Sequence, residues 1–251
     1  MMVKIKLVAY AVSLLVVMNQ LSGCSTVETV KENEISAKPD PPKYKPFHEI
    51  PNTTFGFVGS LRRSSGELIG STVLIDSNVA LTAAHCIIET EISYVEFGDD
   101  VYTIDYTVSY EKESYRDHDI GLIFLNEDVV GVDPVRRVSD LFSAVKKWDP
   151  VVSIGYSKNI KKVSSIHTFR FYGVLYKQEN QIQVLPMKGS IWFGDSGGGL
   201  FRFGVDGFQL IGILASFSQV DGVIAENTST RVDWYYEWIE SEILKSKIPI
   251  I

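Results

Sequence analysis

The sequence has only two cysteines, Cys24 and Cys86, too few for a disulfide framework. It has no excess of basic residues: 24 lysines and arginines stand against 31 acidic residues, giving a net charge of −7. Nothing therefore points to nucleic acid as a partner. The apolar run near the N-terminus, residues 7–18, is too short for a comfortable transmembrane helix. No signature of a metal cluster, a phosphate-binding loop or another cofactor is present, and we expect none.

What the sequence does have is a series of apolar segments of strand length. Its 251 residues are 45% hydrophobic, which is enough for one large β domain or two small ones with an ample core. Many short strands separated by turn residues indicate a sandwich or a barrel. The segments expected as strands are residues 55–61, 67–75, 79–82, 94–97, 101–108, 121–125, 151–156, 168–176, 181–185, 200–203 and 208–214.

The C-terminal part is expected to be helical. Asp233 is suited to cap a helix that runs to about residue 245. Within it, Trp234, Trp238 and Ile239 recur at helical spacing, and Ile243 continues the same face. We expect this helix to pack on the last β structure.

The N-terminus has the features of an export signal. Lys4 and Lys6 precede the apolar run, and the segment ends in Leu-Ser-Gly-Cys at residues 21–24. This ending resembles the lipobox of bacterial lipoproteins. The resemblance implies cleavage after residue 23 and acylation of Cys24, which would anchor the chain in a bacterial envelope membrane. By the same analogy, Ser25 favours the outer membrane.

The next segment, residues 24–51, is polar and contains prolines at positions 39, 41, 42, 46 and 51. It lacks a sustained apolar period, so we interpret it as a disordered or polyproline-like tether. The alternative that residues 47–50 pack across the domain stays open. Residues 52–251 are then the folded domain, with two halves that divide near residues 130–150.

A serine among small and acidic residues stands at the centre of the segment 194–198, Gly-Asp-Ser-Gly-Gly. A serine hydroxyl is a poor nucleophile at neutral pH, and it needs a base to accept its proton. It also needs backbone N–H groups directed at the charge that develops on the attacked carbonyl. On this segment alone, the alternative of a glycine-rich turn between two strands stays open.

His85 and Asp119 are the candidates for the base and for the acid that orients it. His85 follows an apolar strand and small residues. Asp119 directly precedes a buried apolar strand, where a carboxylate needs a partner such as an imidazole N–H. Asp117 is the rival acid, but it lies farther out in a polar run.

Three motifs in order, LTAAHC at 81–86, DIGL at 119–122 and GDSGG at 194–198, resemble those of the chymotrypsin/trypsin-like serine proteases. The resemblance implies an all-β fold of two six-stranded antiparallel barrels followed by a C-terminal helix. It implies that Ser196 is the nucleophile, His85 the general base and Asp119 the residue that orients it. The N–H groups of Gly194 and Ser196 would form the oxyanion hole.

The sequence departs from the family pattern at two places. The family commonly pairs the cysteine after its histidine with one in a CGGS-like strand, but here that strand reads Ile-Gly-Ser-Thr at 69–72, so Cys86 lacks this partner. Many members are activated when a new Ile-Val-Gly-Gly N-terminus pairs with the aspartate before the serine. No such sequence occurs near residues 51–58, so the partner of Asp195 is not evident.

The substrate pocket implied by the resemblance is neutral. Ser190 stands where trypsin-like members carry an aspartate, and Ser216, Phe217 and Ser218 resemble the family's Ser-Trp-Gly edge. Asn227 falls near the pocket wall. His167 would suit a pocket for acidic side chains, but its neighbours form an ordinary strand pattern.

The leading interpretation is therefore a serine endopeptidase for protein or peptide substrates, tethered to the cell envelope. Two alternatives stay open: a catalytically silent protease fold that binds a protein, and a protease that a partner or a cleavage activates.

Overall fold

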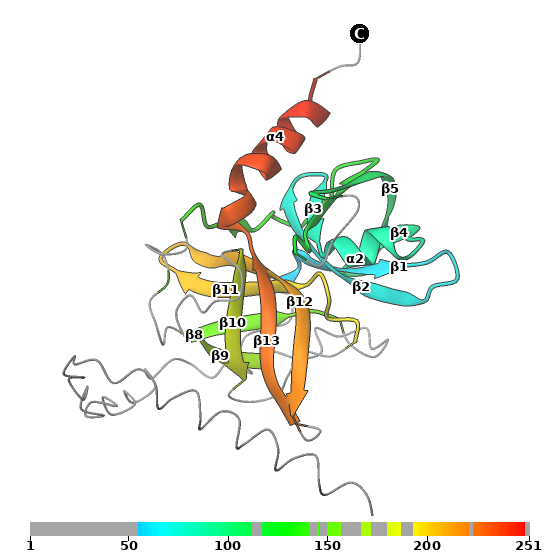
Figure 1. Cartoon of the computed structure of the whole chain (residues 1–251). Coiled ribbons are helices and arrows are strands. Elements are labelled where there is room, and N and C mark those ends of the chain that lie inside the picture. Colours follow the sequence, from blue (N-terminus) through cyan, green and yellow to red (C-terminus); the bar gives the residue numbers. More distant parts are fainter. Residues whose placement is uncertain are drawn as a thin grey trace, which may run out of the picture. The chain divides into compact units, whose positions relative to one another are not determined.

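The structure is a computed structural model that describes residues 55–111, 117–140, 145, 150–156, 167–171, 180–186, 193–220 and 223–248. The predicted signal, tether and lipidated Cys24 lie outside the described residues. Figure 1 shows two groups of strands, coloured cyan to green and yellow-green to orange, followed by a red C-terminal helix. The expected mostly β fold is confirmed.

The first group of strands closes into an antiparallel barrel in the order β1-β2-β3-β6-β5-β4. This confirms the six-stranded first barrel. One short helix, α2 (Ala84–Ile88), follows β3 and was not predicted. The barrel strands are β1 (Val58–Arg62), β2 (Leu68–Asp76), β3 (Val79–Thr82), β4 (Tyr94–Phe97), β5 (Asp100–Ser109) and β6 (Gly121–Leu125).

The strands that lead into the site, β3 and β6, are buried at every residue. A fully buried strand has no solvent face, so its sequence is a continuous apolar run rather than an alternation. The two strands pair directly, with Leu81 opposite Leu122 and Thr82 opposite Gly121. Their adjacent ends therefore bring the residues after β3 close to the residues before β6.

The second group of strands is a seven-stranded sheet in the order β11-β8-β9-β10-β13-β12-β7. An additional pairing of β11 with β12 joins six of these strands into a ring, and the short β7 adds to β12 in parallel. The strands are β7 (Arg136–Arg137), β8 (Pro150–Ile154), β9 (His167–Phe171), β10 (Gln181–Pro186), β11 (Gly199–Gly204), β12 (Gly207–Val220) and β13 (Val223–Arg231).

Strand β13 was missed because its sequence is polar, and residues 55–57 were wrongly included in the first strand. The polar residues Ser229 and Thr230 of β13 are nevertheless buried, since the strand pairs with β10 on one side and β12 on the other. Backbone hydrogen bonds to two neighbours satisfy the main chain of such a central strand whatever its side chains are. Periodicity alone therefore does not reveal it.

The two groups of strands share apolar contacts. One continuous cluster of buried side chains contains residues from both, such as Leu74 of β2 and Phe201 of β11. The ring of Phe57 lies 5.4 Å from that of Phe201, and the ring of Phe55 lies 4.8 Å from that of Phe208. Such aromatic pairs contribute about 0.5–1.5 kcal/mol each beyond their buried area. These contacts hold the halves together.

The C-terminal helix is confirmed, with corrections at its start. A 3₁₀ turn, η3 (Asp233–Tyr235), precedes α4 (Tyr236–Ser246). Asp233 does not cap α4; its carboxylate instead forms an ion pair with Arg231, at 2.6 Å. Trp234 is 47% exposed and lies against the Arg231 guanidinium, so it does not share the buried face. Ile239 and Ile243 are buried as expected.

Candidate active site

The structure brings His85 and Asp119 together. His85 lies in α2, directly after β3, and Asp119 lies just before β6. The Asp119 carboxylate accepts two hydrogen bonds from His85, one from ring Nδ1 to Oδ2 at 2.8 Å and one from the backbone N–H to Oδ1 at 3.0 Å. The paired ends of the two buried strands thus fix both the position and the orientation of the imidazole.

Burial and hydrogen bonding act in opposite directions on the pKa of His85. Burial lowers it because the imidazolium loses hydration, whereas the hydrogen bonds to Asp119 and Cys86 raise it. The net effect is a pKa raised above the ordinary value of 6.5. Since Nδ1 carries the proton that Asp119 accepts, the neutral ring has its acceptor lone pair on Nε2.

Polar residues from the second half support the backbone on both sides of Asp119. The Thr230 hydroxyl of β13 donates to the Asp119 carbonyl at 2.9 Å. Next to it, the Tyr235 hydroxyl lies 2.7 Å from His118 Nδ1, and the Asn180 amide donates to Tyr235 and to the Asp117 carbonyl. Sequence patterns assigned no role to Thr230, Asn180 or Tyr235. Asp117, the rival acid, contributes its carbonyl to this network.

Residues 193–198, which we call the serine loop, lead into β11. Gly194 and Gly197 have φ angles of +97° and +83°, which side chains other than glycine rarely adopt. A Cβ at Gly197 would lie only 2.2 Å from the Ser71 carbonyl oxygen and the Thr82 hydroxyl. Asp195 is 2% exposed.

The serine loop is attached to β2 and lies beside α2. The backbone N–H of Ser71 donates to the Ser196 carbonyl at 2.7 Å. The thiol of Cys86, the residue after His85, donates weakly to the same oxygen at 3.8 Å. Ser196 therefore sits next to the element that carries His85.

The family model described as Trypsin matches residues 46–239. This chain belongs to the trypsin family. The match includes the segments that carry His85, Asp119 and Ser196. Trypsin-family proteases act on protein or peptide substrates, so the family implies substrates of this class.

Solved structures show the same fold. Two structures of kallikrein-related peptidase 10, one of them a complex with Zn2+, match with TM-scores of 0.62 and 0.63. Their sequence identities to this trypsin-family chain are 19% and 20%, and each match covers 78% of this chain and 99% of the other. A search of curated protein sequences found no match.

The predicted pocket residues are only partly described. Ser190 lies outside the described residues. Ser216 is exposed on β12, and β12 pairs with β13 so that Phe217 lies opposite Asn227 and Ser218 opposite Glu226. Asn227 is fully buried, and within the described part of the chain neither polar atom of its side chain has a hydrogen-bond partner. His167 begins β9, where it pairs with Ser153.

Cys86 is a buried free thiol. The position that faces it on β2 is Gly70, where a Cβ would lie 2.9 Å from the Cys86 sulfur. The stability of the first barrel near His85 therefore rests on packing rather than on a disulfide bridge between β2 and α2.

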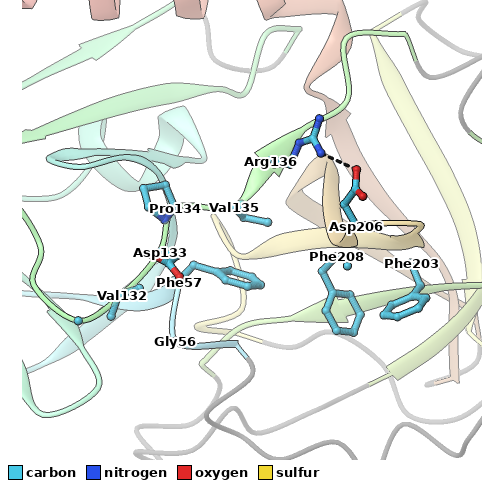
Figure 2. A pocket seen from close by; sticks show the side chains of 12 residues that line it. Gly56, Phe57, Val132, Asp133, Pro134, Val135, Arg136, Phe203, Asp206 and Phe208 are labelled. Atoms are coloured by element: carbon cyan, nitrogen blue, oxygen red, sulfur yellow. Dashed lines mark hydrogen bonds and ion pairs between the residues drawn. The ribbon is translucent and has the colours of Figure 1, made fainter.

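A separate pocket of about 560 Å³ lies between the start of β1, the 131–136 segment and the β11–β12 turn. Figure 2 shows the rings of Phe57, Phe203 and Phe208 along it, with the Arg136–Asp206 ion pair at its edge. None of the predicted site residues lines this pocket.

Metal sites and membrane helices are both absent from the described ranges of the chain. In those ranges, no cluster of His, Cys, Asp and Glu is arranged to hold a metal ion. None of the helices there is long and apolar enough to cross a membrane.

Proposed function

We propose that this trypsin-family protein is an active serine endopeptidase in which Ser196, His85 and Asp119 form the catalytic triad. The observation that carries the proposal is the double hydrogen bond between Asp119 and His85. It holds the imidazole in one tautomer, and it leaves Nε2 as the acceptor that a general base requires.

In the proposed reaction, Ser196 Oγ attacks the carbonyl carbon of the substrate peptide bond while His85 Nε2 accepts the hydroxyl proton. The negative charge that forms on the carbonyl oxygen is bound by the N–H groups of Gly194 and Ser196. The C–N bond then breaks, and His85 gives its proton to the leaving amine. Water then attacks the acyl-enzyme in the same way, with His85 as the base, and releases the carboxylic acid and Ser196.

The raised pKa of His85 fits this cycle. The imidazolium formed in the first step is stabilised by the adjacent Asp119 carboxylate, which lowers the free energy of the transition state. The same stabilisation means that the resting enzyme needs a pH high enough for His85 to be neutral. We therefore expect activity to rise with pH through a midpoint above the ordinary histidine value.

A fluorophosphonate probe tests the proposal, because it reacts with a serine only when a base and an oxyanion site activate it. Purified full-length protein should be labelled, and Ser196→Ala should not. Labelling that persists in Ser196→Ala would place the reactive group elsewhere. A wild-type protein that resists the probe on its own and labels after addition of cell extract would indicate activation by a partner. Resistance under every condition would favour a binding role.

We propose that the S1 pocket, which holds the side chain before the cleaved bond, takes large uncharged side chains. Asn227 is buried and neutral, and Ser190 would supply a hydroxyl rather than a carboxylate. A pocket without a buried counter-charge disfavours lysine, arginine and acidic side chains, because their desolvation is not compensated. Cleavage of a peptide library should show this preference, and a strong preference for charged residues would contradict it.

We also propose that the protease is anchored in a bacterial envelope membrane through a lipid on Cys24. The support is the Leu-Ser-Gly-Cys ending of the N-terminal apolar segment. The Cys24→Ser variant should move from the membrane fraction to the soluble fraction of cell lysates. Equal membrane association of both proteins would refute the lipid anchor.

A further inference from the structure

The oxyanion site needs the peptide groups of the serine loop held in one orientation, and Ser71 of β2 contacts this loop twice. Its hydroxyl donates to the Gly194 carbonyl at 2.8 Å, and its backbone N–H donates to the Ser196 carbonyl at 2.7 Å. The two carbonyls belong to the two residues whose N–H groups are proposed to bind the oxyanion.

The direction of the Ser71 hydroxyl proton follows from its other contact. The backbone N–H of Tyr156, after β8, donates to Ser71 Oγ at 2.8 Å. That N–H can only donate and the Gly194 carbonyl can only accept, so the hydroxyl must accept from Tyr156 and give its proton to Gly194. One hydroxyl thus links the first barrel, the second sheet and the serine loop.

Ser71 is itself rigidly held. It is fully buried, and its carbonyl accepts a hydrogen bond from the Thr82 hydroxyl at 2.8 Å. The same carbonyl lies so close to Gly197 that only glycine fits there. Every polar group of Ser71 therefore has a partner, and three of its contacts restrict the serine loop.

We propose that Ser71 is a positioning residue that keeps the oxyanion site of this protease assembled. The inference rests on the proposed endopeptidase function. The hydrogen bond to the Gly194 carbonyl fixes the peptide plane between residues 194 and 195. Together with the bond to Ser196 it holds the loop from the first barrel, which is a rigid closed structure. Preorganised donors are effective because they need no rearrangement when charge develops.

The consequence for activation is direct. The hydrogen bonds that Ser71 makes are present in a chain that contains no Ile-Val-Gly-Gly sequence near its domain start. The loop is held from β2, at a position inside the barrel that does not depend on where the chain begins. The protease should therefore be active without a newly cut N-terminus.

The test compares three full-length proteins: wild type, Ser71→Ala and Thr72→Val. Thr72 is the matched control because it is the next residue on β2, is fully buried and donates its hydroxyl to the Leu81 carbonyl at 2.7 Å, within the first barrel. Both changes remove one buried hydroxyl: that of Thr72 makes one hydrogen bond, and that of Ser71 makes two, to Gly194 and from Tyr156. Only Ser71→Ala removes a contact to the serine loop.

The first measurement is hydrogen exchange of the Gly197 and Gly198 amides, which donate to Leu214 and to Asp195. Ser71→Ala should speed their exchange at least about tenfold, since a loosened loop opens locally, and Thr72→Val should not. Equal exchange in all three proteins would overturn the inference whether or not the protein is a protease. If Ser71→Ala does not fold, a crystal structure of the wild type decides: a Ser71 hydroxyl beyond hydrogen-bond distance from the Gly194 carbonyl refutes the inference.

The second measurement is the rate of fluorophosphonate labelling. Loss of an oxyanion donor costs about 100–1000-fold, so a misplaced donor in Ser71→Ala should slow labelling by about 10–100-fold. Thr72→Val should label at the wild-type rate. Apart from removal of the proposed signal before Cys24, the labelled wild-type protein should have the intact mass of an uncleaved chain with its lipid and the probe. Labelling confined to a chain cut again between Cys24 and β1 would overturn the inference.

The two measurements separate the two proposals. If Ser71→Ala speeds amide exchange in the loop but no wild-type labelling occurs, the positioning role stands and the endopeptidase proposal fails. If the wild type labels and Ser71→Ala labels equally fast, the protease proposal stands and the positioning role fails.

Discussion

A disulfide introduced between β2 and α2 is the sharpest test of the site's geometry. At Gly70, a Cβ would lie 2.9 Å from the Cys86 sulfur and 3.8 Å from the Cys86 Cβ. Disulfides have a mean Cβ–Cβ distance of about 3.8 Å, so Gly70→Cys should pair with Cys86 without backbone displacement between these two positions.

The expected change in stability follows from the length of the chain segment that the disulfide closes and from the crowding around the new side chain. Closing a loop of about 16 residues stabilises the fold by about 3 kcal/mol relative to the reduced form. The new Cβ would also lie 2.8 Å from the Ser196 carbonyl oxygen, closer than ordinary contact. Overpacking of this kind costs about 1–3 kcal/mol, so the oxidised variant should gain little over the wild type even though it gains much over its own reduced form.

The assay compares melting temperatures of oxidised and reduced Gly70→Cys in a Cys24→Ser background. For a domain of this size, about 3 kcal/mol corresponds to roughly 6–12 °C between the two forms. Gly70→Ser measures the crowding without the bond. Free thiols that persist under oxidising conditions, or two forms that melt within about 2 °C of each other, would refute the reasoning.

Three further predictions follow from the contacts of the site. The pKa of His85 is raised in the folded protein, so protonation of His85 stabilises the fold fully below its unfolded pKa of about 6.5. This stabilisation is lost as the pH rises through the higher folded pKa. Asp119→Asn should therefore flatten the pH dependence of the free energy of unfolding, measured in urea between pH 6 and 9. Gly197→Ala should destabilise the protein by about 2–5 kcal/mol through its φ of +83° and its clash with backbone, and a loss below about 1 kcal/mol would argue against the positive φ and close packing of the serine loop at this glycine. Arg231→Met should cost about 3–5 kcal/mol because it removes the ion-pair partner of the Asp233 carboxylate, and restoring stability with a second change, Asp233→Asn, would verify that the loss of this ion pair is the cause.

Local pattern was sufficient for most strands of this protein and insufficient for a few elements. Strands such as β3 and β6 are short apolar runs between turns, and such runs predict a buried strand from the sequence alone. Strand β13 contains Glu226, Asn227 and Thr228, and nothing in that sequence distinguishes it from a loop. Its extended state is imposed by the two strands that flank it, a long-range effect that local propensity does not contain. The start of α4 was misjudged for a related reason, since Arg231 takes the carboxylate expected to cap it.

The sequence by itself determined the family and the three residues proposed for catalysis, because their motifs are short, contiguous and in a fixed order. Only the tertiary structure decided which residues support them. Ser71 and Gly194 are 123 positions apart, and their hydrogen bond exists because the closed barrel sets the register of β2 against the serine loop. Contacts between distant segments depend on register and packing, and neither is written in the residues that make the contact.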